Sequence, residues 1–131
     1  MFNWQVRVYY EDTDALGLVY YANYLKFMER ARTEWLRELG FEQDGLISQG
    51  FGFVVVSVSV DYKKPACFND ELRVETRLAK HSKASLVFEQ EIIRGAELLV
   101  KASIKVCCIN LEGHKPCGIP PLLLKEITRA S

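Results

Sequence analysis

Three acidic side chains lie within four positions near the start of the chain. Glu11, Asp12 and Asp14 belong to the stretch YYEDTDALGLVYYANY, which continues through Gly17 into an aromatic segment almost without charge. A carboxylate in this position can cap a helix, bind a metal ion, or act as a nucleophile or general base. Each of these roles makes a different demand on the residues that follow.

The spacing excludes an EF-hand calcium loop. Asp12, Asp14 and Gly17 match positions 1, 3 and 6 of such a loop. Position 5 would be Leu16 and position 12 would be Asn23, where the loop needs an oxygen ligand and a bidentate glutamate. Two mismatches at ligand positions rule out this interpretation.

The cysteines do not form a recognisable zinc site either. Cys67, Cys107, Cys108 and Cys117 contain no C-x-x-C pair, and the spacing of His114 and Cys117 matches no standard zinc pattern. Neighbouring residues of a strand point to opposite faces, so Cys107 and Cys108 cannot both ligate one ion. We therefore expect reduced thiols in a reducing compartment.

Helix capping and chemistry both remain open for Asp14. Asp and Thr commonly accept hydrogen bonds from the free N–H groups at a helix start. However, Asp14 is seven positions before Tyr21, whereas a cap residue lies within three residues of the amides that it serves. This separation allows the carboxylate to face a cleft whose other wall carries the first N–H groups of the helix, an arrangement that suits a carbonyl group.

The composition describes a single soluble domain. The chain has 131 residues, of which 49% are hydrophobic and 26% are charged, and 17 Lys and Arg balance 17 Asp and Glu. The neutral balance gives no indication of nucleic-acid binding. No apolar run is long enough to span a membrane, and the N-terminus lacks the pattern of a signal peptide. We expect a cytoplasmic protein.

One long helix is strongly predicted. Residues 4–10 (WQVRVYY) alternate as a first strand, and residues 22–40 (ANYLKFMERARTEWLRELG) follow the helical period up to a stop at Gly40. The apolar stripe of this helix comprises Tyr24, Leu25, Met28, Ala31, Trp35, Leu36 and Leu39.

The remainder of the chain is typical of an antiparallel sheet. Strands are predicted over 56–62, 70–82, 84–93 and 97–111, with a tight turn at 94–96 between the last two, and the Pro-rich IPPLLLKEI could form a short terminal helix. The pattern predicts an α+β fold of one domain over residues 1–131, in which a five-stranded antiparallel sheet wraps around one long central helix. Such a sheet has an exposed edge, so we expect a homo-oligomer, either a dimer or a tetramer.

The stretch YYEDTDALGLVYYANYLKFMERARTEWLR resembles the start of the hotdog-fold acyl-CoA thioesterases. It is similar to the Tol–Pal-associated YbgC branch and, more distantly, to 4-hydroxybenzoyl-CoA thioesterase, through the pattern D-x-D-x-x-G-x-V-Y-[HY]-x-N-Y. The resemblance continues through VVVSVSVDYKKPACFNDEL and KASLVFEQEI, so it covers nearly the whole chain. It implies a hotdog fold and an enzyme linked to lipid metabolism.

The resemblance also implies catalytic residues. The catalytic carboxylate falls on Asp14, the backbone N–H that polarises the thioester carbonyl falls on Tyr21, and a tyrosine implicated in the YbgC branch falls on Tyr10. That branch usually carries His at position 21, whereas this chain has Tyr, as the 4-hydroxybenzoyl enzymes do. A backbone N–H acts with any side chain except proline, so the departure affects only a side-chain role.

Residues for the coenzyme A (CoA) end are implied at a turn of the sheet. The nucleotide contacts of the family cluster in the region of KHSKAS, so His81, Ser82, Lys83 and Ser85 are the candidates. The alternative is a solvated hairpin tip. The implied reaction is metal-independent hydrolysis of acyl-CoA without a cofactor, in which Asp14 is either the nucleophile or the general base.

Two other functions compete with hydrolysis. A hotdog hydratase acting on enoyl thioesters is disfavoured, because those sites usually pair Asp with a nearby His and the first histidine here is His81. A non-catalytic module that binds acyl groups or an acyl carrier protein is the alternative from another class. Release of thiol from acyl-CoA distinguishes it from an enzyme.

Overall fold

The computed structural model describes residues 1–131 as one curved sheet with three helices. The strands are β1 (Phe2–Arg7), β2 (Phe51–Tyr62), β3 (Glu71–His81), β4 (Ser85–Arg94), β5 (Glu97–Asn110) and the two-residue β6 (Lys115–Pro116). The helices are α1 (Asn23–Glu38), α2 (Gln43–Ser48) and α3 (Pro121–Ala130), and a 3₁₀ turn, η1, covers Tyr10–Asp12.

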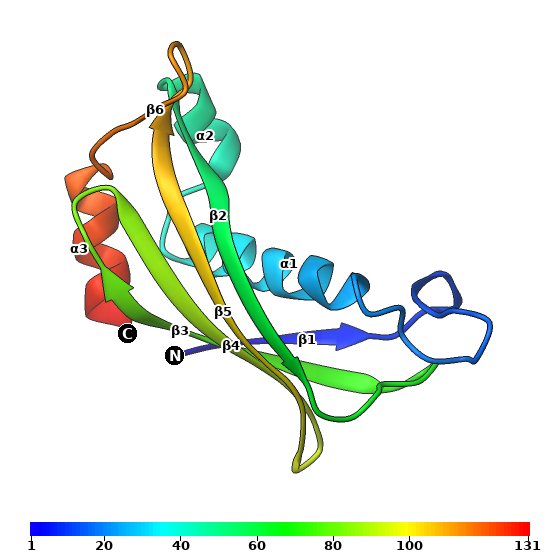
Figure 1. Cartoon of the computed structure of the whole chain (residues 1–131). Coiled ribbons are helices and arrows are strands. Elements are labelled where there is room, and N and C mark those ends of the chain that lie inside the picture. The colour runs from blue at the N-terminus through cyan, green and yellow to red at the C-terminus, as the bar shows by residue number, and fades with distance from the viewer.

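The five long strands pair in the order β1-β3-β4-β5-β2, all antiparallel, and β6 extends the sheet beside β5. The sheet curves strongly, and α1 lies inside the curve (Figure 1). The predicted sheet around a central helix is therefore confirmed. This architecture is the one that the resemblance to the hotdog-fold thioesterases implied.

Helix α1 is held by one buried face. Its buried side chains are Tyr24, Phe27, Met28, Ala31, Trp35 and Leu36. The helix ends where the sequence predicted, because Gly40 adopts a φ of +94° and the Phe41 N–H donates back to the Leu36 carbonyl at 2.8 Å. This termination turns the chain towards α2, which the sequence did not predict.

Strand β1 ends three residues earlier than predicted, at Arg7 and not at Tyr10. The next backbone groups bond the connection before β3: the Val8 N–H donates to Asp70 O at 2.9 Å, and the Asn69 N–H donates to Val8 O at 3.0 Å. Tyr10 therefore belongs to the turn η1 and not to a strand. This correction places Tyr10 beside the acidic turn.

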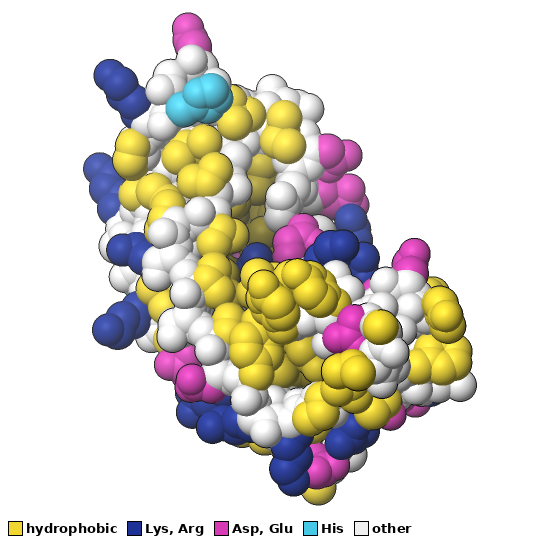
Figure 2. Space-filling model, turned by 45° about the vertical axis from the view of Figure 1, so that its right-hand side comes forward, with side chains coloured by type: hydrophobic (Ala, Val, Ile, Leu, Met, Phe, Trp, Pro, Cys, Tyr) yellow, Lys and Arg dark blue, Asp and Glu magenta, His cyan; other side chains and the backbone are white.

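A groove remains between α1 and β2. Helix α1 packs mainly on β1 and β3, at the opposite side of the sheet from β2. Two hollows consequently lie between α1 and β2, one at each end of the uncovered concave face. Hydrophobic side chains gather around this groove, with acidic and basic side chains beside its middle (Figure 2).

Strand β2 is an unprotected edge. It pairs with β5 on one side only, and Val54, Val55, Val56 and Val58 are each between 39% and 53% exposed. A long apolar edge strand is a site for pairing with another chain.

None of the helices combines the length and the apolar character that crossing a membrane requires.

Candidate active site

The acidic turn is shaped by its own backbone. The Asp14 N–H donates to Leu18 O at 2.8 Å and the Gly17 N–H donates to Asp14 O at 3.0 Å, while Gly17 has the positive φ of +76° that glycine adopts readily. The Leu16 N–H donates to Asp14 Oδ1 at 2.9 Å. The other carboxylate oxygen, Oδ2, accepts no hydrogen bond from the chain and is free to act on a ligand.

The turn before α1 leaves backbone donors unused, and the Tyr21 N–H is one of them. The Tyr20 N–H donates to Asp12 O at 3.0 Å and the Asn23 N–H donates to Tyr20 O at 2.8 Å, but the Tyr21 N–H between them has no acceptor within the chain. The first N–H groups of a helix carry its partial positive charge. The Tyr21 N–H is therefore a donor available to an external oxygen.

Asp14 and Tyr21 line the same hollow at one end of the groove. This hollow has a volume of about 280 Å³. Its lining comprises Asp14, Leu18, Val19, Tyr21, Tyr24, Tyr62, Lys63, Lys64 and Pro65. Asp14 and Tyr21, the residue just before the N-cap of α1, thus line one cavity. A carboxylate and a backbone N–H on the same cavity would be a combination that stabilises charge on a carbonyl oxygen.

Tyr10 lies on the other side of Asp14. It lines a second hollow together with Asp14 and Phe68, and its ring meets that of Phe68 edge-on, with 6.0 Å between the ring centroids. Tyr10 is 82% exposed, so its ring is not part of the core. The turn η1 directs this ring away from the core.

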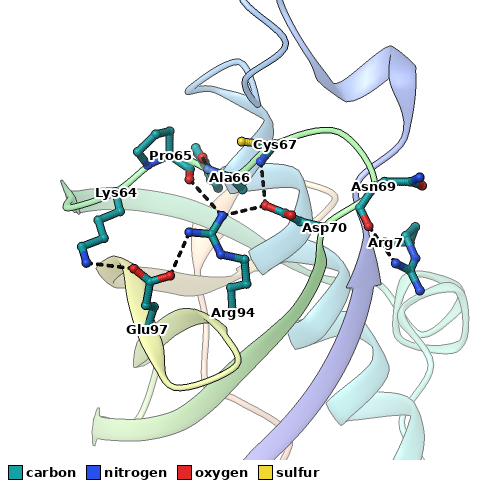
Figure 3. A network of polar contacts seen from close by, with 10 residues as sticks. Arg7, Lys64, Pro65, Ala66, Cys67, Asn69, Asp70, Arg94 and Glu97 are labelled. Atoms are coloured by element: carbon teal, nitrogen blue, oxygen red, sulfur yellow. Dashed lines mark hydrogen bonds and ion pairs between the residues drawn. The ribbon is translucent and has the colours of Figure 1, made fainter.

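An ion-pair network fixes the segment that forms the wall of the site. The Arg94 guanidinium donates to Asp70 Oδ2 at 2.7 Å and to Glu97 Oε1 at 2.9 Å (Figure 3). Lys64 Nζ donates to Glu97 Oε2 at 2.8 Å, and the Cys67 N–H donates to Asp70 Oδ2 at 2.8 Å. Hydrogen bonding to Asp70, and then to Glu97, raises the pKa of Arg94 above its usual value.

The fixed segment holds the acidic turn through backbone hydrogen bonds. The Val19 N–H donates to Ala66 O at 2.9 Å, and the Phe68 N–H donates to Gly17 O at 3.3 Å. The Ala66 N–H in turn donates to the buried hydroxyl of Tyr24 at 2.9 Å. The connection between β2 and β3 therefore joins Asp14 to α1 and to the β4–β5 hairpin.

The four residues predicted for CoA lie at the other end of the sheet. Strand β3 begins beside the acidic turn and ends at His81, so roughly 30 Å of extended chain separates the two places. At the tip, Ser82 Oγ and Ser85 Oγ are 2.7 Å apart, which closes the hairpin. Lys83 forms no ion pair. One chain does not bring this loop to Asp14.

Sequence reasoning missed the wall formed by residues 62–68. Tyr62 lines the hollow and donates a hydrogen bond of 3.1 Å to Tyr21 O. The available signal was the stretch DYKKPACF, in which two lysines and a proline end an alternating strand. This signal marks a loop but gives no indication of which site the loop meets.

The chain matches known proteins along nearly its whole length. The sequence profile of the thioesterase-like superfamily matches residues 8–127. An acyl-CoA thioesterase YbgC from Haemophilus influenzae is 48% identical over 130 residues, which is 98% of this chain and 93% of that protein. An acyl-CoA thioester hydrolase YbgC from Escherichia coli is 42% identical over 127 residues, which is 96% of this chain and 95% of that protein.

Solved structures agree with these sequence matches. A 1,4-dihydroxy-2-naphthoyl-CoA thioesterase from Synechocystis superposes with a TM-score of 0.91 at 29% identity, covering 97% of this chain and 95% of that chain. The curled sheet, the central helix and the full-length similarity all lead to one assignment. The chain belongs to the thioesterase-like superfamily and has its hotdog fold.

Proposed function

We propose that this thioesterase hydrolyses acyl-CoA with Asp14 and the Tyr21 backbone N–H as its catalytic groups. The observation that carries the proposal is their position on one hollow, where the Tyr21 N–H has no acceptor and one Asp14 oxygen has no donor. The thioester carbonyl oxygen accepts a hydrogen bond from the Tyr21 N–H. The partial positive charge at the start of α1 strengthens this bond as negative charge develops on the oxygen.

Two routes then lead to the same products. In the first, an Asp14 oxygen attacks the carbonyl carbon, the C–S bond breaks, CoA leaves as a thiolate that takes up a proton, and water hydrolyses the mixed anhydride. In the second, Asp14 removes a proton from a water molecule that attacks the carbonyl carbon directly, the C–S bond breaks, and CoA leaves as a thiolate that takes up a proton. Both routes place the free oxygen of Asp14 towards the hollow. The exposed hydroxyl of Tyr10 orients Asp14 or the acyl group from the opposite side.

The CoA end of the substrate needs a second copy of the chain. We assign the CoA phosphates to Lys83, with Ser82, Ser85 and His81 around it, although this loop lies roughly 30 Å along β3 from Asp14 in the same chain. If two β2 edges pair antiparallel, the C-terminal end of β2, at Tyr62, lies beside the N-terminal end of β2 in the second copy. Within each chain, the N-terminal end of β2 pairs with the part of β5 that also pairs with the start of β4, next to the predicted CoA loop.

We therefore propose a homo-oligomer in which each site is shared between two protomers. An acyl carrier protein is a further candidate donor of the acyl group. Four free thiols agree with a cytoplasmic location, because disulfides are rare in that compartment.

Substitution of Asp14 tests the proposal. Asp14→Asn keeps the size of the side chain but removes the charge, and it should reduce thiol release from acyl-CoA at least 100-fold. Glu11→Gln is the matched control, because Glu11 belongs to the same acidic turn and makes no side-chain hydrogen bond. Unchanged turnover in Asp14→Asn would reject the assignment. Saturable acyl-CoA binding without thiol release in the unmodified protein would instead identify a non-catalytic binding module.

A further inference from the structure

A second charged group faces the groove between α1 and β2. Arg32 extends from α1 and is partly buried, and its guanidinium has a single acceptor in the chain, Gln90 Oε1, at 2.8 Å from Nη1. Guanidinium carries five N–H donors, so most of its donors are not used by the chain. Burial lowers the pKa of Arg32, and the negative charge of Glu29 opposes this effect.

Buried polar groups hold this guanidinium in place. Gln90 is fully buried, and its amide nitrogen donates to Met28 O and to Thr76 Oγ1, each at 2.9 Å. With both N–H groups of the amide engaged, its oxygen must face Arg32. Burying a glutamine and a threonine in a core costs free energy unless every group is paired, so this arrangement fixes the direction of the Arg32 side chain.

No carboxylate of the chain neutralises Arg32. It forms no ion pair within 4.0 Å. By contrast, each of the four arginines on the strands does so, namely Arg7, Arg73, Arg77 and Arg94. Glu29, at the rim, accepts a hydrogen bond from Thr33 Oγ1 at 3.0 Å, and Gln43 donates to the same Thr33 oxygen at 3.2 Å. Glu29, Thr33 and Gln43 line the same cavity as Arg32, and the bond from Thr33 engages one Glu29 oxygen without bringing it into an ion pair with Arg32.

The cavity beside Arg32 is small and mainly apolar. Its volume is about 120 Å³, close to the size that accepts a benzene-sized group. Its apolar lining comprises Leu36, Phe53, Val55, Leu86, Phe88 and Val106. A partly buried cation beside an apolar cavity is stabilised by an anionic group attached to an apolar chain, because the chain fills the cavity while the anion pairs with the cation.

The Arg32 cavity and the Asp14 hollow both lie between α1 and β2, and no residue lines both of them. Tyr24 and Tyr62 line the hollow at one end, whereas Arg32 and Val55 line the cavity further along α1 and β2. Tyr24 precedes Arg32 by eight residues, which is about 12 Å along a helix. An acyl chain held by its carbonyl at Tyr21 would reach Arg32 by running along α1 and β2 from the hollow to the cavity.

We propose that Arg32 selects acyl groups that carry a carboxylate at their far end, through charge-assisted hydrogen bonds from its guanidinium. The preferred substrates are thus CoA monothioesters of dicarboxylic acids, with Phe53, Val55 and Phe88 around the methylene chain. The inference rests on the proposed thioesterase activity and adds a substrate class to it. Arg32 is the residue that determines specificity, and Asp14 remains the catalytic group.

A matched series of substrates tests the inference. At each chain length, kcat/KM is measured for the plain alkyl, the ω-hydroxy and the ω-carboxy acyl-CoA. The ω-carboxy substrate should exceed its alkyl counterpart about tenfold or more at the optimal length, since hydrogen bonds to charged groups are strong. Arg32→Met should remove this preference and leave kcat/KM for the alkyl substrate within about twofold.

Two further variants control for folding and charge. Glu29→Gln removes a repelling carboxylate without touching Gln90, so it should increase the preference for the ω-carboxy substrate. Arg32→Lys keeps the charge but not the fork geometry and should retain part of the preference. Thermal unfolding of each variant shows whether the loss of the Gln90 contact has impaired folding. If Arg32→Met does not fold, the effect of Glu29→Gln on the preference for the ω-carboxy substrate still tests the inference.

The outcomes separate this inference from the proposed function. Hydrolysis of all substrates with no preference for the carboxylate, or a preference that survives Arg32→Met, overturns the role of Arg32 alone. If no substrate is hydrolysed, the proposed function fails, and calorimetric binding of the free dicarboxylic and alkyl monocarboxylic acids then tests Arg32 directly. A homo-oligomer in which a carboxylate of the second copy bonds Arg32 would also overturn the inference.

Discussion

The phenol of Tyr62 donates a hydrogen bond of 3.1 Å to the backbone carbonyl of Tyr21. This contact joins the end of the edge strand β2 to Tyr21, which lines the Asp14 hollow and whose N–H is proposed to bind the thioester carbonyl. The two rings also meet edge-on, with 6.2 Å between their centroids, and burial raises the pKa of Tyr62. The strand and the helix start are thereby fixed relative to each other.

Tyr62→Phe removes this hydrogen bond but keeps the ring. We expect kcat to fall several-fold, because the Tyr21 backbone loses a restraint, while the free energy of unfolding changes by only about 1 kcal/mol. Steady-state thiol release and urea unfolding measure the two quantities. An unchanged kcat would show that the hydroxyl has no influence on the position of Tyr21.

Tyr21→Pro removes the N–H assigned to the carbonyl. Losing one donor of this kind typically costs about 10²–10³ in kcat, and we expect a loss in that range. Tyr21→His is the matched control, because it changes the side chain and keeps the N–H, and it should retain most of the activity. Circular dichroism verifies that α1 still forms in both variants. Equal losses in the two variants would instead assign the role to the Tyr21 side chain.

Arg94→Gln should reduce kcat more than it reduces stability. The guanidinium acts on Asp14 only through Asp70 and the connection between β2 and β3, so its loss displaces the acidic turn while KM changes little. The Arg94–Asp70 pair is only part-buried, and ion pairs near the surface each contribute about 0–1 kcal/mol to stability.

Arg77→Gln is the control for this prediction. It breaks the Arg77–Glu89 ion pair, which joins the neighbouring strands β3 and β4 and has no hydrogen bond to the connection between β2 and β3. The thermal midpoints of the two variants should be similar, and only Arg94→Gln should lower kcat. Equal kcat values at equal stability would exclude a positioning role for Arg94.

Val58→Lys tests the shared site. Val58 is 44% exposed on the unpaired edge of β2, where a lysine opposes pairing with another strand. Light scattering should show a shift towards the monomer, and activity should fall with it, because one chain does not bring the CoA loop to Asp14. A monomer with full activity would contradict the shared site. Lys101→Ala, on the interior strand β5, is the control.

Alkaline pH should destabilise the protein through Cys108. Burial, together with the neighbouring thiol of Cys117, raises the pKa of Cys108 from 9.0 to about 12. The unfolded chain loses this proton at a lower pH than the folded chain does. The stability contribution is therefore complete below pH 9 and is lost as the pH rises towards 12.

The pH dependence of unfolding measures this effect. The free energy of unfolding should fall less steeply above pH 9 in Cys108→Ala than in the unmodified protein. Cys67→Ala is the matched control, because Cys67 is exposed, and it should keep the steep fall. A slope in Cys108→Ala equal to that of the unmodified protein would assign the alkaline transition to other groups, such as the buried hydroxyl of Tyr24.

The periodic parts of the fold were predictable from the sequence. The helix predicted over 22–40 is α1 at Asn23–Glu38, and the turn at 94–96 contains Gly95 with a φ of +62°. Within the helix, Leu25 is 37% exposed and Phe27 is fully buried. The sequence period locates an apolar face but does not decide which of its border residues the sheet covers.

Elements stabilised by distant contacts were not predictable. Helix α2 contains Gly45 and only two large apolar residues, and the burial of Leu46 against the core holds it in place. The position of Lys83 relative to Asp14 likewise depends on the length of β3 and, in the proposed homo-oligomer, on a second copy of the chain. Such distances are set by the assembled sheet, so a local pattern gives no indication of them.

The bulge in β2 has a consequence for the whole assembly. The pairing of β2 with β5 shifts by one residue between Val55 and Ser57, so Val56 has no counterpart on β5. A bulge bends its strand and increases the local twist. A continuous flat filament of sheets is therefore disfavoured, and growth at this edge should stop after one partner has joined.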